Sequence, residues 1–575
     1  MSNLSSGVCA IKAKFIVHKP DIILKNDGQA ESSLKRKLER EENEDESSKS
    51  NSKKRGQNKA RPKTFQDDKQ NKPCPSIIDI RITGEQPKCQ YTNCKFIHNP
   101  LDYLKMKPKD IGEKCLLFDV RGKCPRGIAC RFGSDHITPE GFNLTNESKI
   151  KEWKEDTINV LQSSLQIKLQ KKKYDFSIAE SVVKSMDSRR HSEKLDSVSD
   201  NTIITSGAIT NEDEIKLQFR EKKKIDWCDK LYLSPLTTVG NLPFRRICKG
   251  FGADITCGEM ALCESLLKGL KQEWALVKRH ESEKIFGAQI CGNNAYIITK
   301  VAQLLQENTE LDFIDLNLGC PIDLIYKKGG GCGMLHRLPA LETSIKSASK
   351  LLSIPFTAKV RTGVYQDKRI AHTIIPKMFE WGVSLVTLHG RSREARYTKS
   401  ADWEYIETCA KAVAPHPVYG NGDILSYEDY LLKKEVASSI QGVMIGRGAL
   451  IKPWIFTEIK EQKTLDISSK ERFEILKKFT NYGLEHWGSD TQGVENTRRF
   501  LLEWLSFLYR YVPVGILERP PQKINERPPT YFGRDDLETL MASSNCADWV
   551  KISEMLLGPV PDGFIFLPKH KANSY

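Results

Sequence analysis

Eight short apolar segments, separated by turns and helical patterns, occupy residues 230–450 and constrain the fold more than any other feature of the sequence. Eight consecutive strand–helix units predict a TIM barrel, in which parallel strands close into a ring inside a layer of helices. A doubly wound open sheet is the alternative, but no G-x-G-x-x-G motif lies between a strand and its helix. The predicted strands are 230–237, 253–260, 285–292, 313–321, 356–363, 385–391, 417–423 and 442–450.

Helical patterns fill the connections between these strands, for instance over residues 294–308 and 340–352. Beyond residue 450 the pattern becomes helical throughout. Segments 471–487 and 495–512 repeat apolar residues at i, i+3 and i+4, which is typical of helices that bury one face. We therefore expect a helical domain after the barrel.

Composition divides the chain into five regions. Residues 26–72 are nearly all charged or polar and cannot bury enough apolar surface to offset the entropy of ordering, so they are predicted to be disordered. The predicted regions are a disordered charged tail (1–70), a cysteine-rich segment (71–140), a charged helical and linker region (141–225), the α/β barrel (226–460) and a helical domain (461–575).

Four shorter segments complete this picture. The charged segment 148–173 is predicted to be largely helical, and a Ser/Asp-rich linker is predicted near 191–212. The basic runs 35–37 and 53–55 are open to two interpretations, nuclear import or solvated disorder. The glycine-rich run 329–333 predicts flexible backbone.

Polar residues end nearly every predicted strand. The carboxyl ends of barrel strands converge on one face, where barrel active sites are built, so these residues predict the active site. They are Pro235, Leu236, Thr237, Glu259, Gln289, Asn317, Cys320, Lys359, Arg361, His389, Arg391, Asn421, Gly422, Asp423, Gly446 and Arg447.

The last two units predict a phosphate site. Asn421-Gly422-Asp423 and Gly446-Arg447 offer backbone amides and a cation after strands seven and eight, where barrels commonly bind phosphate groups. A phosphate-bearing cofactor is therefore expected, and Gln289 and Lys359 could bond the polar edge of a flavin ring.

Two Cys/His clusters predict metal sites. Three thiolates and one imidazole suit structural zinc, and both clusters resemble CCCH zinc fingers. Phe96 and Phe132 lie two residues after the third cysteine of each cluster and could stack on unpaired bases; a zinc-stabilised spacer is the alternative. The predicted ligands are Cys74, Cys89, Cys94 and His98, with an unusually long first gap, and Cys115, Cys124, Cys130 and His136.

Charge and hydropathy favour a protein that binds a polyanion and argue against a membrane-spanning or secreted protein. The net charge of +15 favours a polyanionic partner, since neutralising phosphates releases counterions. No apolar run reaches 18 residues, and the N-terminus lacks the pattern of a secretory signal. We therefore expect an intracellular protein of the cytoplasm, the nucleus or both, in which the 16 cysteines are not disulfide-bonded.

Ordered motifs in the barrel carry a resemblance. SPLT, GAQICG, LNLGCP, AKVRTG, TLHGR, GNGD and GRGAL follow one another at spacings similar to those of the tRNA-dihydrouridine synthases. The run from TRRFLLEWL to the end resembles the eukaryotic branch with N-terminal zinc fingers, which modifies uridine 47. The resemblance implies FMN, NADPH as hydride donor, Zn²⁺, and tRNA as partner, with mRNA left open as a second RNA; we expect a monomer.

The resemblance also implies roles for individual residues. Cys320 matches the family's proton donor, in the N-x-x-C-P motif. The positions that match flavin-binding residues are Pro235, Leu236, Thr237, Gln289, Lys359, His389, Asn421, Gly422, Asp423, Gly446 and Arg447.

The chemistry supports a thiol acid independently. A hydride added to carbon 6 of uracil leaves an enolate whose carbon 5 must be protonated, and a thiol of pKa about 8.5 keeps its proton at neutral pH. Asn317 would orient the ring, and Lys359, Arg361 or His389 would offset charge on the carbonyl oxygens. Cys332, twelve residues beyond Cys320, is the alternative acid.

Two other functions remain open from the sequence. A small-molecule flavin dehydrogenase of the dihydroorotate or dihydropyrimidine type would share the barrel and the reaction, but needs neither fingers nor a helical domain. An inactive RNA-binding protein would not need Cys320, Lys359 and His389.

Overall fold

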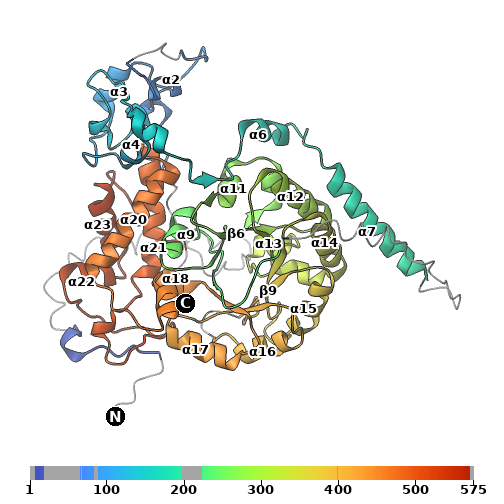
Figure 1. Ribbon diagram of the computed structural model, residues 1–575. Helices are drawn as coiled ribbons and strands as arrows, with labels where there is room; N and C mark the ends of the chain where they lie inside the picture. Colours follow the sequence, from blue (N-terminus) through green and yellow to red (C-terminus); the bar gives the residue numbers. More distant parts are fainter. Residues whose placement is uncertain are drawn as a thin grey trace, which may run out of the picture.

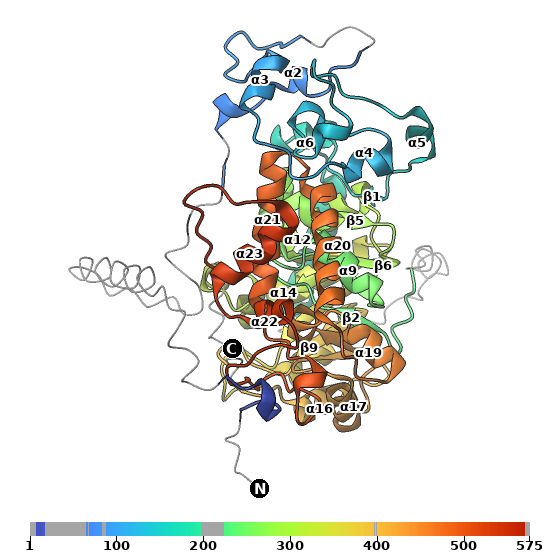
Figure 2. The same cartoon turned by 90° about the vertical axis from the view of Figure 1, so that its left-hand side faces the viewer.

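The computed structural model describes residues 7–17, 62, 65–66, 68–82, 88–196, 223–395, 397 and 399–569. A barrel, seen end-on in Figure 1, lies beside a group of long helices, and the cysteine-rich segment sits above those helices. Figure 2 shows the same arrangement from the helical side, with the cysteine-rich segment at the top of α20 and α21.

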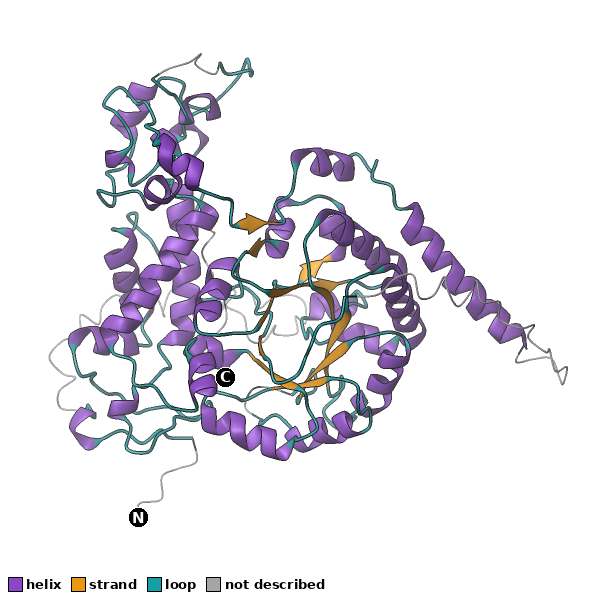
Figure 3. Ribbon diagram, in the orientation of Figure 1, coloured by secondary structure: helices purple, strands orange, loops and turns teal. Residues whose placement is uncertain are grey.

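Eight parallel strands close into a ring, which confirms the predicted TIM barrel (Figure 3). Pairing of β3 with β6 closes the ring, and a short additional strand, β4 (Ala261–Leu262), pairs with the end of β6. In chain order the ring strands are β2 (Leu231–Leu233), β3 (Ile255–Cys257), β6 (Ile285–Cys291), β7 (Phe313–Asn317), β8 (Phe356–Arg361), β9 (Leu385–His389), β10 (Val418–Asn421) and β11 (Gly442–Ile445).

Amphipathic helices cover the outside of the ring. The predicted helices 294–308 and 340–352 correspond to α12 and α14, and the Asn294 side chain caps α12 by accepting the N–H of Ile297. The main covering helices are α9 (Leu242–Gly250), α12 (Ala295–Asn308), α14 (Leu338–Leu351), α15 (Ala371–Glu380), α16 (Trp403–Lys411) and α17 (Tyr427–Val436).

An apolar plug fills the amino end of the barrel. Rings of Tyr232, Phe313, Tyr419 and Trp227 meet edge-to-face, and the Tyr419 hydroxyl donates to the carbonyl of Trp227. Gly287 is required beside them, because a Cβ there would lie 2.2 Å from the Phe313 ring. With this end packed, only the carboxyl end is left for a site.

The C-terminal part is helical, as predicted. The long helices α20 and α21 pack against each other, and α20 also packs against α9 of the barrel. Ser468 and Glu471 form a capping box at the start of α20, and Trp504 of α21 donates its indole N–H to the carbonyl of Leu450. The helices are α18 (Arg447–Ile451), α19 (Ile455–Glu461), α20 (Ser469–Trp487), α21 (Thr491–Leu508), α22 (Asp536–Ala542) and α23 (Cys546–Leu557).

The prediction of a largely helical segment over 148–173 is wrong in part. The chain forms α5 (Glu147–Glu152), a strand β1 (Thr157–Ile158), α6 (Ser163–Gln170) and then α7 (Ser177–Asp196). Tertiary contacts override local helix propensity here: β1 pairs antiparallel with β5 (Arg279–His280), and Asp156 bonds His280. The predicted linker near 191–212 begins inside α7, and its part from 197 onward lies outside the described residues.

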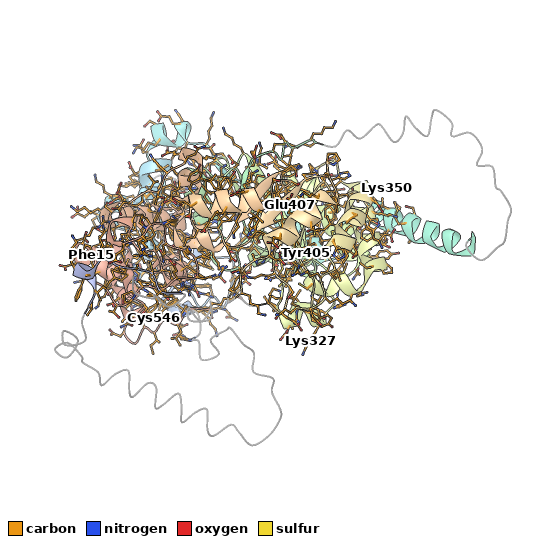
Figure 4. The ribbon with its side chains drawn as sticks, turned by 90° about the horizontal axis from the view of Figure 1, so that it is seen from below. Phe15, Lys327, Lys350, Tyr405, Glu407 and Cys546 are labelled. Atoms are coloured by element: carbon orange, nitrogen blue, oxygen red, sulfur yellow. The ribbon has the colours of Figure 1, made fainter. Side chains whose placement is uncertain are left out.

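Residues 7–17 contradict the prediction of a disordered tail. They form isolated bridges with residues of the C-terminal region, and the Cys9 and Ile11 side chains are buried there with Leu517. Figure 4 shows Phe15 on the helical side of the molecule with Cys546, away from the barrel residue Lys350. Burial of these apolar side chains stabilises residues 7–17 against the C-terminal region. The basic runs 35–37 and 53–55 lie outside the described residues.

The glycine-rich run is ordered, contrary to prediction. Residues Gly331–His336 form a 3-10 helix, and Gly331, Cys332 and Gly333 are buried. The glycines serve close packing: Gly331 has a φ of +54°, and a Cβ there would lie 3.0 Å from the Cβ of Cys320.

Candidate active site at the carboxyl end of the barrel

Strand register brings the predicted site residues to one rim. Asn317 lies beside Lys359, and Arg361 lies beside His389. His389 in turn lies beside Asn421 on β10. Asn317, Arg361, His389 and Asn421 end adjacent parallel strands, and Lys359 lies two residues before the end of β8, so their side chains meet at the carboxyl end of the barrel.

Buried hydrogen bonds hold Asn317 in one orientation. Its amide Nδ2 donates to Gln289 Oε1 at 2.8 Å, and Gln289 Nε2 donates to Asp315 at 2.8 Å. Asp315 also accepts the Thr357 hydroxyl at 2.7 Å. Both polar ends of Gln289 are therefore engaged with the protein, which leaves it one N–H and one lone pair for a cofactor. Asp315 and Thr357 were not predicted from the sequence, because they look like ordinary strand residues.

Cys320 is fixed from two sides. The Asn317 carbonyl Oδ1 accepts the backbone N–H of Cys320 at 2.8 Å, and Gly331 packs against the Cys320 side chain. Cys320 is 8% exposed, and burial raises the pKa of its thiol, so the thiol keeps its proton at neutral pH. Cys332, the alternative acid, is fully buried with its pKa raised to about 11. The geometry therefore favours Cys320.

Two cationic side chains of β8 lie on the same rim as this thiol. Burial and the nearby Arg361 lower the pKa of Lys359 to about 8, and its Nζ donates to Asn421 Oδ1 at 3.2 Å. Arg361 donates to the carbonyls of Gly319 and Ser392, both at 2.9 Å, and so joins the loops after β7 and β9. Neither hydrogen bond of Arg361 neutralises its charge.

Asp423 organises the opposite side of the rim. Its carboxylate accepts two hydrogen bonds from Arg391, at 2.7 and 2.6 Å, and one from Arg447 at 2.5 Å. The Tyr397 ring lies 4.1 Å from the Arg447 guanidinium. Asp423 thus orients Arg391 and Arg447. The sequence pattern placed these residues at strand ends but did not show that they pair.

His389 is a neutral member of this cluster. Burial and the surrounding cations lower the pKa of its imidazole well below the usual value. Its Nε2 lies 3.3 Å from Arg391 Nη1. His389 can therefore hydrogen-bond a ligand but cannot offset charge as a cation at neutral pH, contrary to one of the roles considered from the sequence.

The donor set fits an anionic cofactor. Four cationic side chains, Lys359, Arg361, Arg391 and Arg447, surround a site where Asp423 is the carboxylate that pairs with two of them. The surplus positive charge suits a phosphate and the carbonyl edge of a flavin.

The loop after β2 completes the rim. Pro235 and Leu236 are partly buried and Thr237 is exposed. The next residue, Thr238, has a φ of +79° and donates its N–H to Glu259 at 2.6 Å. Lys569, near the C-terminus, donates to the Thr238 hydroxyl at 2.9 Å, a contact across the chain that no local sequence pattern signals. Burial raises the pKa of Glu259 to about 7.

The second Cys/His cluster has the geometry of a metal site. Its four donor atoms lie within 4.8 Å of one another, and all four residues are buried. His136 Nδ1 lies 3.1 Å from Asn143 Oδ1, whereas its Nε2 is buried without a hydrogen-bond partner. An imidazole held at one nitrogen, with the other unsatisfied beside thiols, fits a metal ligand.

The first cluster brings its four donors equally close together but is less buried. Phe96 packs against this cluster, and Phe132 packs against the second one, so neither ring projects freely. Tyr91, between the second and third ligands, is instead 79% exposed. Tyr91 is therefore the aromatic side chain of this cluster that is accessible for stacking on a base. Tyr91 was not predicted from the sequence, because only the aromatic residue two positions after the third cysteine was considered.

Fold and site together define a barrel enzyme with a cation-rich cofactor site and a buried thiol at its rim. Residues 232–506 match the family model described as "Dihydrouridine synthase (Dus)". The chain is 55% identical to "tRNA-dihydrouridine(47) synthase [NAD(P)(+)]-like" of Xenopus laevis over 537 residues, covering 91% of this chain and 83% of that protein.

Two further relatives carry the same description. The Homo sapiens protein is 52% identical over 558 residues, with 91% of this chain and 84% of that protein covered. The protein of Oryza sativa subsp. japonica is 41% identical over 594 residues, with 87% and 86% covered. This chain belongs to the dihydrouridine synthase family and is a flavin-dependent oxidoreductase, which confirms the resemblance seen in its motifs.

Within the described residues, no helix combines the length and the apolar character needed to cross a bilayer.

Proposed function

We propose that this enzyme binds FMN at the cation-rich rim, takes reducing equivalents from NADPH, and reduces the carbon 5–carbon 6 double bond of uridine 47 in tRNA. The observation that carries the proposal is the protonated Cys320 thiol near Arg361, on the same rim of the barrel as Lys359. The names of the relatives support the RNA, the position and the nicotinamide donor.

The protein's own residues would divide the work as follows. Bound FMN would supply the hydride for carbon 6 of uracil. The Cys320 Sγ–H would give its proton to carbon 5, and Asn317 would hold the Cys320 backbone in place. Lys359 and Arg361 would stabilise negative charge on the uracil carbonyl oxygens, and Lys359 would also donate to the polar edge of the flavin ring. Arg391 and Arg447, oriented by Asp423, would hold the FMN phosphate.

The remaining regions would bind the RNA. We assign zinc to both Cys/His clusters, because three thiols and an imidazole meet in each. Exposed Tyr91 would stack on an unpaired base, and the helices from residue 461 onward would contact the tRNA body. Fingers and helical region argue against a dehydrogenase of free pyrimidines, which would need neither. We retain a monomer of the cytoplasm, the nucleus or both, with mRNA as a second RNA.

Substrate specificity tests this proposal. Purified enzyme with NADPH should form dihydrouridine in a tRNA transcript that carries uridine 47, and should leave free uridine unchanged. A transcript with cytidine at position 47 is the matched control and should accumulate no dihydrouridine. Equal activity on both transcripts, or on free uridine, would refute the assignment.

The cofactor should be FMN and should be bound without a covalent bond. The cation-rich site offers charges and hydrogen bonds for the phosphate, so acid precipitation should release the yellow colour into the supernatant. Chromatography of that supernatant identifies the flavin. Recovery of FAD, or flavin that stays with the pellet, would contradict this prediction.

Flavin affinity should depend on pH through Lys359. The pKa of its ammonium is lowered to about 8, so the cation is present below that pH and is lost as the pH rises through it. A bound flavin favours the charged form, so the Kd for FMN should increase above about pH 8, by at most about tenfold per pH unit. Fluorescence titration measures this increase. The Lys359→Arg variant, which stays charged, should lack it; an identical pH profile in both proteins would exclude Lys359 as the cause.

A further inference from the structure

The second Cys/His cluster is built against the turn between α20 and α21. Cys130 forms an antiparallel bridge with Asp490, and the N–H of Arg131 donates to the Ser489 carbonyl at 2.8 Å. The two partners are more than 350 residues apart in the chain. The cluster and the helical hairpin therefore share backbone hydrogen bonds.

Ser489 places its hydroxyl among the predicted metal ligands. Its Oγ lies 3.1 Å from Cys130 Sγ and 3.6 Å from Cys124 Sγ, and the residue is 2% exposed. A thiolate bound to zinc accepts hydrogen bonds from neighbouring donors, and such outer partners stabilise and orient metal ligands. The hydroxyl of Ser489 is placed for that role.

Arg126, which lies between Cys124 and Cys130 of the second cluster, packs against the same turn at Gly488. Arg126 donates to the Trp487 carbonyl at 3.1 Å and lies 3.7 Å from the Asp490 carboxylate. Gly488 has a φ of +107°, and a Cβ there would lie 2.3 Å from Arg126 Nε. The turn thus takes a conformation that glycine favours and leaves space for Arg126.

The first cluster has a local donor instead. Its hydroxyl neighbour is Ser76, two residues beyond Cys74 in the short helix α2 (Pro75–Ile78), with Oγ 3.2 Å from Cys74 Sγ. Ser76 provides a matched comparison, because its hydroxyl donates to a ligand thiol without joining the helical hairpin.

We propose that Ser489 is a positioning residue of the second zinc site, and that it makes this finger and the α20–α21 hairpin one rigid tRNA-binding body. The inference rests on the proposed zinc at Cys115, Cys124, Cys130 and His136. Ser489 acts through the thiolates. When zinc replaces the thiol protons, the Ser489 hydroxyl donates its hydrogen bond to Cys130 Sγ, steadies the zinc site, and so fixes the orientation of the finger on the hairpin.

The test is thiol protection in the full-length flavin-bound enzyme. Zinc is first counted by elemental analysis, and the alkylation of each cysteine is then followed by peptide mass spectrometry in the presence of a chelator. In Ser489→Ala, alkylation of Cys124 and Cys130 should be faster by roughly 10-fold, the lower range for loss of an outer-shell partner. Cys89 and Cys94 should react as in the unaltered enzyme. The KM for tRNA should rise several-fold with little change in kcat.

Ser76→Ala should give the reverse pattern, with faster alkylation of Cys89 and Cys94 and none of the effect on Cys124. If zinc is absent from the second cluster in the unaltered enzyme, the proposed metal site itself fails. If zinc is present but Ser489→Ala leaves Cys124 and Cys130 protected, the role of Ser489 is refuted.

A second measurement does not depend on how the variant folds. Removing zinc from the unaltered enzyme should increase hydrogen exchange at residues 487–493, where the finger meets the hairpin. Unchanged exchange there would overturn the proposal of a single rigid body.

Discussion

Cys320→Ala should slow reoxidation of the NADPH-reduced enzyme by tRNA by about 10²- to 10⁴-fold, the usual contribution of a general acid. The reason is that the Cys320 thiol, which burial keeps protonated, would be the proton source for carbon 5 of uracil. Reduction of the flavin by NADPH needs no proton from this side chain and should keep a near-normal rate. Stopped-flow absorbance of the flavin follows the two half-reactions separately.

Cys332→Ala is the matched control for this variant. Cys332 follows the Gly331 that packs on Cys320, yet it is fully buried. Its replacement should leave reoxidation within a few-fold of normal. If the two variants exchange behaviour, Cys332 is the acid; if Cys320→Ala makes dihydrouridine at the normal rate, Cys320 has no catalytic role.

Cys124→Ser should remove one of two zinc equivalents and weaken tRNA binding while the barrel keeps its flavin. Cys124 is fully buried among Cys115, Cys130 and His136, so an altered ligand cannot be replaced by water without opening the cluster. Opening this cluster should displace the second finger from the RNA. A loss on the scale of one base contact, about 1–3 kcal/mol, lowers tRNA affinity by about 5- to 150-fold. Elemental analysis and a binding titration at fixed salt measure the two effects.

Cys409→Ser is a suitable control, because Cys409 is equally buried but lies in α16 of the barrel, away from both clusters. It should keep both zinc equivalents and full tRNA affinity. If Cys124→Ser loses its zinc and still binds tRNA normally, the fingers are spacers, and the assignment of RNA contact to them is wrong.

The barrel could be predicted from the sequence because its signal is local and repeated. Each ring strand is a short apolar run, and polar residues lie at or near the carboxyl end of most of them, so the strand pattern alone groups Asn317, Lys359, Arg361 and His389. The two Cys/His clusters could also be predicted, because most of their members follow one another at short spacings.

Contacts distant in the chain could not be predicted. Nothing in the sequence around Ser489 indicates that its hydroxyl meets Cys130, and nothing near Lys569 indicates a bond with Thr238. The failed predictions have the same origin. Near residue 157, pairing with β5 overrides the local preference for a helix. In the run 329–333, Gly331 allows close packing on Cys320 and does not make the backbone flexible.

The most direct test of the proposed function is to map dihydrouridine in RNA from cells that lack this protein. We expect dihydrouridine to disappear from position 47 of tRNA, while dihydrouridine at other tRNA positions remains. Re-expression of the unaltered protein should restore the modification, and re-expression of Cys320→Ala should not. Unchanged dihydrouridine at position 47 in the cells without the protein would contradict the account.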